Sequence, residues 1–257
     1  SLIMRILYHL MRADFLERAR SYGFLIILGL AILLGFLVNN GTIGLTLGKY
    51  RGEYNTGFVG AMMSLVATVF LSWFGFYLVK NAIQRDERTG VGQIIATTPL
   101  SRLHYVAGKA LSNFAVLAIM VVILIIAAIV LQLLSDERSG FSLLDLVTPF
   151  LLITLPVLAV VAALAVLFES LPWLSGGFGN VVFFFGWAFF LSIGIESRNS
   201  LLDISAIHLI SKSMMEAARR TFPDYSGGFV LGNSGQEIAG TFRWNGIAWT
   251  PALLMIR

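Results

Sequence analysis

Five long apolar stretches constrain this chain more than any other feature of its sequence. None of them contains Asp, Glu, Lys, Arg or His, and they cover residues 22–38, 58–79, 110–134, 146–168 and 178–195. A helix needs about 20 mostly apolar residues to cross a bilayer. In lipid, only helices and closed barrels satisfy every backbone polar group. The sequence therefore predicts an all-α polytopic membrane protein with five complete transmembrane helices.

The composition excludes a water-soluble fold. Of the 257 residues, 57% are hydrophobic and 12% are charged, whereas soluble domains carry about 25% charged residues. The chain has no cysteine, which excludes a disulfide-rich module and a thiolate metal site. The net charge of +4 indicates basic cytoplasmic loops in a membrane protein, so we expect no nucleic-acid partner.

The two ends of the chain differ from the five stretches. Residues 1–21 combine apolar side chains at helical spacing with arginines, which predicts an interfacial helix whose arginines face anionic lipid. These arginines are Arg5, Arg12, Arg18 and Arg20. The last apolar run, 246–256, is too short to span a membrane. Because the chain also begins with Ser1, we expect an amino-terminal fragment, with one incomplete membrane domain over 1–257 and the start of a sixth span.

The loop charges predict an orientation. Four arginines precede the first span and five basic residues lie between the second and third, against three in the loops 39–57 and 135–145. Basic loops stay in the cytoplasm, so we expect the amino terminus and the 80–109 loop there, in the cytoplasmic membrane. Residues 196–245 then form an outer segment. Within it, 201–220 reads as an amphipathic helix that Phe222-Pro223 ends.

The spans carry little chemistry of their own. Carriers driven by protons or sodium bury acidic or histidine side chains in the bilayer, and these spans have none. Hydrogen bonds between helices are the ordinary role of their hydroxyl and amide groups. A pore would instead turn some of them toward a shared cavity. The candidates for such a translocation path are Ser64, Thr68, Ser72 and Asn113.

No catalytic or nucleotide-binding constellation is present in the sequence. Residues 174–177 read Leu-Ser-Gly-Gly, like the start of the signature of ABC ATPases, but no phosphate-binding G-x-x-x-x-G-K-[ST] loop exists. An intramembrane enzyme would need a Ser/His, paired Asp or metal constellation inside the spans, and they hold no Asp or His. We therefore expect neither enzymatic activity nor a cofactor on this chain.

The loop 82–109 is the most informative segment. A charged exit from the second span meets Gly90 and Gly92, and an apolar turn follows over 93–97. Pro99 ends that turn, because the residue before a proline leaves the helical region, and Ser101 can cap the next helix. A short helix between two spans can act as a lever that moves both. A plain solvated connection fits the residues equally well.

Three parts of this loop resemble the first cytoplasmic loop of ABC type-2 transporter permeases. They are Glu87-Arg88-Thr89-Gly90, Thr98-Pro99-Leu100-Ser101-Arg102 and Gly108-Lys109. In that family the loop forms a coupling helix that docks on the ATPase subunit. The interfacial helix and the order of the spans resemble the family too. The outer segment 196–245 is longer than in simpler members.

The resemblance implies a permease subunit of an exporter with an unknown substrate. It would pair with a second permease copy or a paralogue, and separate ATPase subunits would carry ATP and Mg. The implied docking residues lie at 85–102. Charged contacts would come from Arg85, Glu87, Arg88 and Arg102, and apolar contacts from Ile94, Ile95 and Leu100. Gly90 and Gly92 would permit a sharp turn, and Pro99 and Ser101 would set the break between two helices. The ATPases would push the loop around Gln93 to Arg102. The alternative is a membrane anchor or scaffold that transports nothing and binds a partner through its outer segment.

Overall fold

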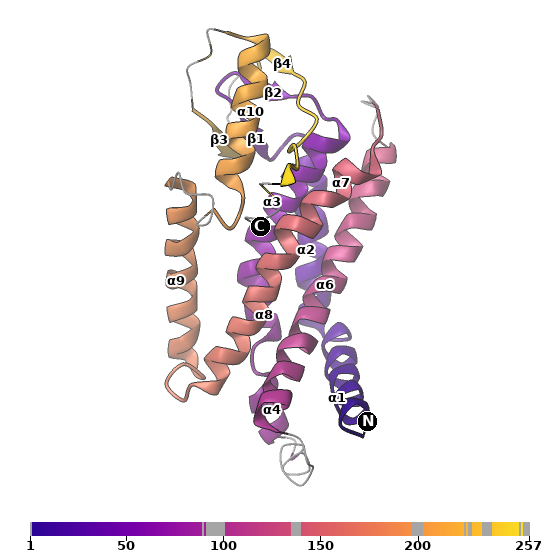
Figure 1. Ribbon diagram of the computed structural model, residues 1–257, viewed down its shortest axis with the longest axis vertical. Helices are drawn as coiled ribbons and strands as arrows, with labels where there is room; N and C mark the ends of the chain where they lie inside the picture. The colour runs from indigo at the N-terminus through magenta and orange to yellow at the C-terminus, as the bar shows by residue number, and fades with distance from the viewer. Residues whose placement is uncertain are drawn as a thin grey trace. The chain divides into compact units, whose positions relative to one another are not determined.

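A computed structural model describes residues 2–88, 90, 101–134, 140–196, 203–223, 225, 228–232, 238–251 and 253. Helices make up most of it (Figure 1). They are α1 (Leu2–Ala19), α2 (Tyr22–Asn39), α3 (Thr56–Val79), α4 (Ala82–Arg88), α6 (Arg102–Leu134), α7 (Leu143–Pro149), the π-helical turn η1 (Phe150–Thr154), α8 (Leu155–Ser170), α9 (Gly177–Glu196) and α10 (Ile207–Thr221).

Within the described residues, five helical segments are long and apolar enough to cross a membrane. They are Tyr22–Asn39, Thr56–Arg88, Arg102–Leu134, Leu143–Ser170 and Gly177–Gly194. The predicted all-α polytopic fold is thereby confirmed. The third span starts at Arg102 rather than at about residue 110, because Ser101 Oγ accepts the backbone N–H of His104 at 3.3 Å. The predicted cap at Ser101 is confirmed as well.

The chain forms two compact units, each built from three segments. Unit 1 consists of Ser1–Gly29, Phe70–Met120 and Val157–Ala188. It contains α1, α4 and parts of the spans. Unit 2 consists of Leu30–Val69, Val121–Pro156 and Phe189–Arg257. It contains α7, η1, α10, the four short strands among the described residues and the remaining parts of the spans.

Aromatic stacking holds α3 and α9 together in unit 1. The rings of Phe76 and Phe183 stack with centroids 3.5 Å apart, and Phe183 stacks in turn on Trp187. Near the end of α3, Lys80 Nζ donates to the Leu174 carbonyl at 3.3 Å and to Asn180 Oδ1 at 2.6 Å. The connection after α3 and the connection between α8 and α9 therefore lie at one side of this unit.

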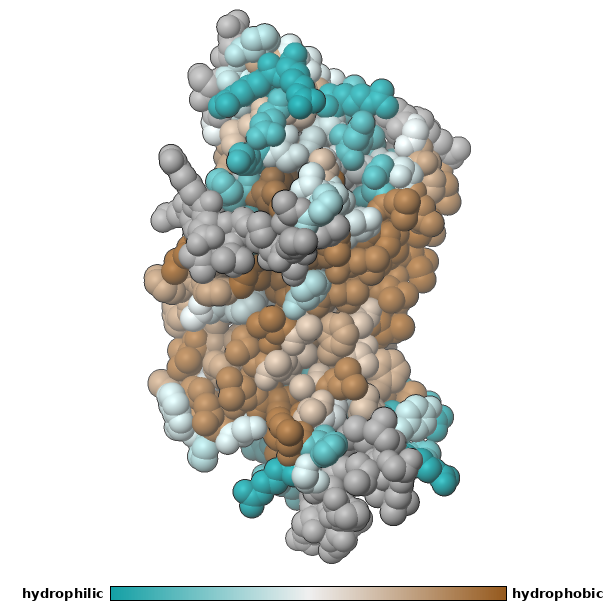
Figure 2. All heavy atoms as spheres, in the orientation of Figure 1, coloured by the Kyte–Doolittle hydropathy of each residue, from teal (hydrophilic) through white to brown (hydrophobic). Residues whose placement is uncertain are grey.

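Two short strand pairs organise unit 2. Strand β1 (Gly44–Thr46) pairs antiparallel with β3 (Val230–Gly232), and β2 (Tyr50–Gly52) pairs in parallel with β4 (Gly240–Phe242). Thr56 Oγ1 also donates to the Gly140 carbonyl at 3.3 Å. The loop after α2, the start of the fourth span and the segment after α10 thus lie at one side of this unit, as alternating spans require. Figure 2 shows hydrophilic side chains over α10 and the strands.

Helix α10 is shorter than the helix that its apolar periodicity predicts. It begins at Ile207 rather than near residue 201, because Ala206 takes a left-handed conformation with φ 59° and the Asp203 carboxylate accepts the N–H of Leu209 at 2.9 Å. It ends at Thr221, immediately before Phe222-Pro223, as predicted. Strands β3 and β4 follow, and the sequence predicts neither of them. Three residues are too few to show a strand's alternation.

Candidate functional site

Buried charges join the two ends of the loop between α4 and α6. Lys109 Nζ on α6 contacts Asp86 Oδ2 on α4 at 2.7 Å and Asp14 Oδ2 on α1 at 2.6 Å. The Tyr105 hydroxyl, one turn before Lys109, donates to the same Asp86 oxygen at 2.7 Å. We call these four residues, Asp14, Asp86, Tyr105 and Lys109, the charge clamp. It ties the loop's entry, its exit and the amino-terminal helix to one another within unit 1.

The side chains of the charge clamp are largely buried. The side chain of Lys109 is 0% exposed, that of Asp86 is 9% exposed and that of Asp14 is 13% exposed. Charges removed from water are costly unless they are paired, so a protein is strongly destabilised when one partner of a buried ion pair is removed and the other stays. Three ions that satisfy one another therefore favour a single arrangement of α1, α4 and α6 in unit 1.

Arg18 adds a second buried cation beside the clamp. Its guanidinium donates to the side chain of Asn113 on α6. Burial, and then repulsion from Arg85, lowers the pKa of Arg18 to about 10, so it stays charged at neutral pH. The prediction that Arg18 faces lipid is wrong, whereas Arg5, Arg12 and Arg20 are exposed. Arg18 is buried because that face of α1 packs on α6, where Ser112 Oγ also donates to the Met11 carbonyl at 3.4 Å.

Glu169, near the end of α8, holds the start of α4. Its two carboxylate oxygens accept the backbone N–H groups of Ala82 at 2.9 Å and Ile83 at 2.6 Å. These are the first residues of α4, whose N–H groups have no partner within the helix. The carboxylate therefore caps α4 and is favoured there by the helix dipole.

Glu169→Gln is expected to loosen the first turn of α4. The amide keeps one acceptor oxygen but loses the second acceptor and the charge, which costs about 1 kcal/mol. Amide hydrogen exchange at Ala82 and Ile83 should then rise about fivefold. The control is Glu17→Gln, because the Glu17 carboxylate contacts Arg85 at 2.9 Å in an exposed ion pair. Unchanged exchange at both amides in Glu169→Gln would contradict the capping role.

The structure describes some of the predicted docking residues. Glu87 and Arg88 are exposed at the end of α4, whereas Arg85 is paired with Glu17. Gly90 has φ 75°, the left-handed conformation that favours glycine and that the predicted sharp turn requires. Ser101 and Arg102 are exposed where α6 begins. The other predicted docking residues lie outside the described residues: Gly92, Gln93, Ile94, Ile95, Pro99 and Leu100.

The four residues predicted for a translocation path are fully buried. In unit 2, the Thr68 hydroxyl bonds to the Ser64 carbonyl at 2.7 Å and to the Thr154 hydroxyl of η1 at 3.0 Å. In unit 1, Ser72 Oγ accepts from the Trp187 indole at 2.9 Å, and Asn113 bonds to Arg18. These are the bonds expected of packed helices. The assignment of a path to these residues stays a prediction.

Sequence reasoning missed the charge clamp. Tyr105 and Lys109 stand four residues apart, which puts them on one face of a helix. This spacing is the one signal in the sequence that could have related two residues of the clamp to each other. Nothing in the sequence relates either residue to Asp14 or Asp86. Among the described residues, no three His, Cys, Asp or Glu side chains lie close enough to hold a metal ion.

A comparison with protein-family models gives one result. Residues 39–256 match the family described as ABC-2 family transporter protein. The match begins at the last residue of α2 and includes α4, the loop to α6, and the outer segment. Helix α1, which contributes Asp14 to the charge clamp, lies before it. No curated protein and no solved structure matches the chain.

Proposed function

The chain belongs to the ABC-2 family of transporter proteins, and we propose that it is the permease subunit through which an ATPase partner drives export of a substrate. The family match and the five apolar helical segments support a membrane transport component with several spanning helices. The export direction, the ATPase partner and the cytoplasmic membrane are parts of the proposal. So is the cytoplasmic position of the amino terminus, which rests on the basic residues beside α1 and α4.

The charge clamp is the observation that carries the proposal. According to the proposal, the ATPase subunits bind ATP and Mg and push the segment 85–102 as they close. Because Lys109 holds both Asp86 and Asp14 at 2.6–2.7 Å, a displacement of the loop moves the ends of α4 and α6 together and takes α1 with them. Without such a link, a push on the loop would be absorbed by bending at its two ends.

The same proposal assigns a pairing of two permease subunits, identical or paralogous. Each would receive the push of its own ATPase, and the substrate would pass between the two subunits. The chain itself catalyses nothing and needs no cofactor. Its exposed apolar helix surfaces face lipid or the second subunit, since soluble proteins do not expose apolar area on this scale.

One observation favours the alternative of a membrane anchor or scaffold. Ser64, Thr68, Ser72 and Asn113 are buried in helix contacts, as a protein without a translocation path would have them. In that case the outer segment with α10 would bind the partner, and no ATPase would be needed at the loop.

The test is purification of the full-length protein from its native membrane in mild detergent, followed by identification of the associated proteins. We expect an ABC ATPase subunit in stoichiometric amount. A known ABC complex from the same membranes serves as the control for detergent damage. Recovery of the chain without any ATPase, while the control complex stays intact, would contradict the proposal and favour the scaffold.

A further inference from the structure

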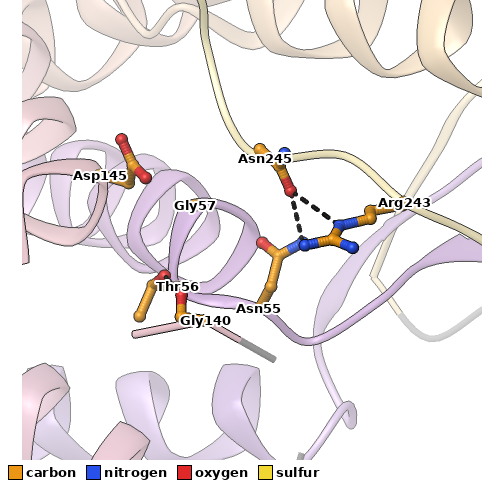
Figure 3. Close-up of a pocket in the computed structure, with 7 residues that line it drawn as sticks. All are labelled: Asn55, Thr56, Gly57, Gly140, Asp145, Arg243 and Asn245. Carbon is orange, nitrogen blue, oxygen red and sulfur yellow. Dashed lines mark hydrogen bonds between the residues drawn. The ribbon is translucent and has the colours of Figure 1, made fainter. Parts of the chain in front are cut away.

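Unit 2 contains a polar pocket where two spans begin (Figure 3). It has a volume of about 130 Å³ and lies at the first residues of α3 and α7. Its lining is Asn55, Thr56, Gly57, Gly140, Asp145, Arg243 and Asn245. Sites for drug-sized ligands have volumes of about 300–1,000 Å³, so this pocket fits a small polar group rather than a whole large substrate.

The segment after β4 is held firmly against the start of α3. Asn55 Nδ2 donates to the Trp244 carbonyl at 2.9 Å, and its Oδ1 accepts the N–H of Phe58 at 2.9 Å. A Cβ at Gly57 would collide with the Asn245 carbonyl, so only glycine permits this approach. These contacts fix the backbone at Trp244 and Asn245, next to Arg243. The pocket is therefore built by the fold and does not depend on a loose side chain.

Two opposite charges line the pocket without neutralising each other. Asp145 and Arg243 are both exposed and form no ion pair with each other within the described structure. Arg243 Nε donates to Asn245 Oδ1 at 3.4 Å, which is a long hydrogen bond. The other N–H donors of the guanidinium stay available to a ligand. Figure 3 shows the Asp145 carboxylate and the Arg243 guanidinium at different sides of the pocket, with Asn55 and Thr56 between them.

We propose that this pocket binds a zwitterionic group, with its primary ammonium at Asp145 and its phosphate or carboxylate at Arg243. A guanidinium matches two oxygens of such an anion with parallel hydrogen bonds. A primary ammonium has three N–H donors, for which the Asp145 carboxylate and the Gly140 carbonyl are acceptors. Quaternary ammonium groups are held by aromatic cages, and none of the seven described lining residues is aromatic. The described lining therefore favours ethanolamine over choline.

The position of the pocket matches a lipid headgroup. Thr56 is the first residue of its span and Asp145 is the third of its own, a depth at which headgroups meet the spans. A soluble zwitterion of the same chemistry would satisfy the same contacts. The proposal does not rest on the proposed transport function, because binding requires no ATPase.

The test measures lipid binding to the delipidated full chain in detergent by native mass spectrometry. The probes are dihexanoyl phosphatidylethanolamine, dihexanoyl phosphatidylcholine and soluble glycerophosphoethanolamine. We expect the ethanolamine lipid to bind about tenfold more tightly than the choline lipid, since charge-assisted hydrogen bonds are lost with choline. Arg243→Gln should weaken both lipids about tenfold. Asp145→Asn should remove the preference for ethanolamine.

Glu216→Gln and Arg220→Gln are the matched controls, because both residues are exposed on α10 and do not line the pocket. They should leave both affinities unchanged. Competition by glycerophosphoethanolamine would support a site for the zwitterion itself, and binding of the lipid alone would support a headgroup site. Equal affinity of the unaltered chain for the two lipids would overturn the proposal. So would an ethanolamine preference that survives Asp145→Asn.

Discussion

Lys109→Met is expected to destabilise the protein by about 3–5 kcal/mol. The substitution keeps an unbranched apolar stem but removes the cation that Asp14 and Asp86 share, each with an oxygen within 2.7 Å of it. Two carboxylates then remain in a site where the lysine is 0% exposed, without the cation that bridged them. Thermal unfolding of the detergent-solubilised chain should show the loss.

The triple variant Asp14→Asn, Asp86→Asn, Lys109→Met separates charge from packing. Replacing a whole buried ionic group by neutral side chains is often close to neutral for stability, so the triple variant should regain most of what Lys109→Met loses. The triple variant should still bind the ATPase subunit. The rate at which that subunit hydrolyses ATP should, however, respond less to the variant than to the unaltered chain. A triple variant as unstable as Lys109→Met would show that the clamp contributes packing rather than ion pairing. Full coupling in the triple variant would contradict the role of the clamp.

Ile95→Asp is expected to separate the ATPase from the membrane subunit more than Arg88→Ala does. An apolar anchor in a docking groove contributes about 2 kcal/mol or more, which is about thirtyfold in affinity. Arg88 is exposed at the end of α4, and a rim charge mainly tunes the association rate. The measurement is the amount of ATPase that copurifies with each variant, together with transport activity once a substrate is known.

A matched control for Ile95→Asp is Ile238→Asp. Ile238 is an isoleucine of the outer segment, 41% exposed in unit 2. It should tolerate the charge without any loss of ATPase. Equal loss of ATPase or of transport activity in Ile95→Asp and Arg88→Ala would contradict docking through the apolar residues of the loop.

The spans were predictable because their signal is local. An apolar run long enough to cross a bilayer without a charge is visible in any window of about 20 residues, and the five runs correspond to the five described helical segments that are long and apolar enough to cross a membrane. Caps and stops are equally local. Ser101 starts α6 and Phe222-Pro223 ends α10, each within a few residues of where its chemistry acts.

The charge clamp and the strands were not predictable because their partners are distant in sequence. Asp14 and Lys109 are 95 positions apart, and each looks like an ordinary charge near a membrane surface until α1 packs on α6. Strands β1 and β3 pair although four spans separate them in the sequence. Arg18 was assigned to lipid because helical spacing shows that a helix is amphipathic but not which neighbour covers its polar face.

The central claim is that the segment 85–102 contacts the ATPase, and site-specific cross-linking tests it most directly. The chain has no cysteine, so each introduced thiol is unique. Arg102→Cys places the thiol where α6 begins and Arg220→Cys places it near the end of α10, and both positions are exposed. A short thiol-reactive cross-linker applied to native membranes should join position 102, and not position 220, to the ATPase subunit. An ATPase that copurifies with the chain but cross-links from position 220 and not from position 102 would contradict the account.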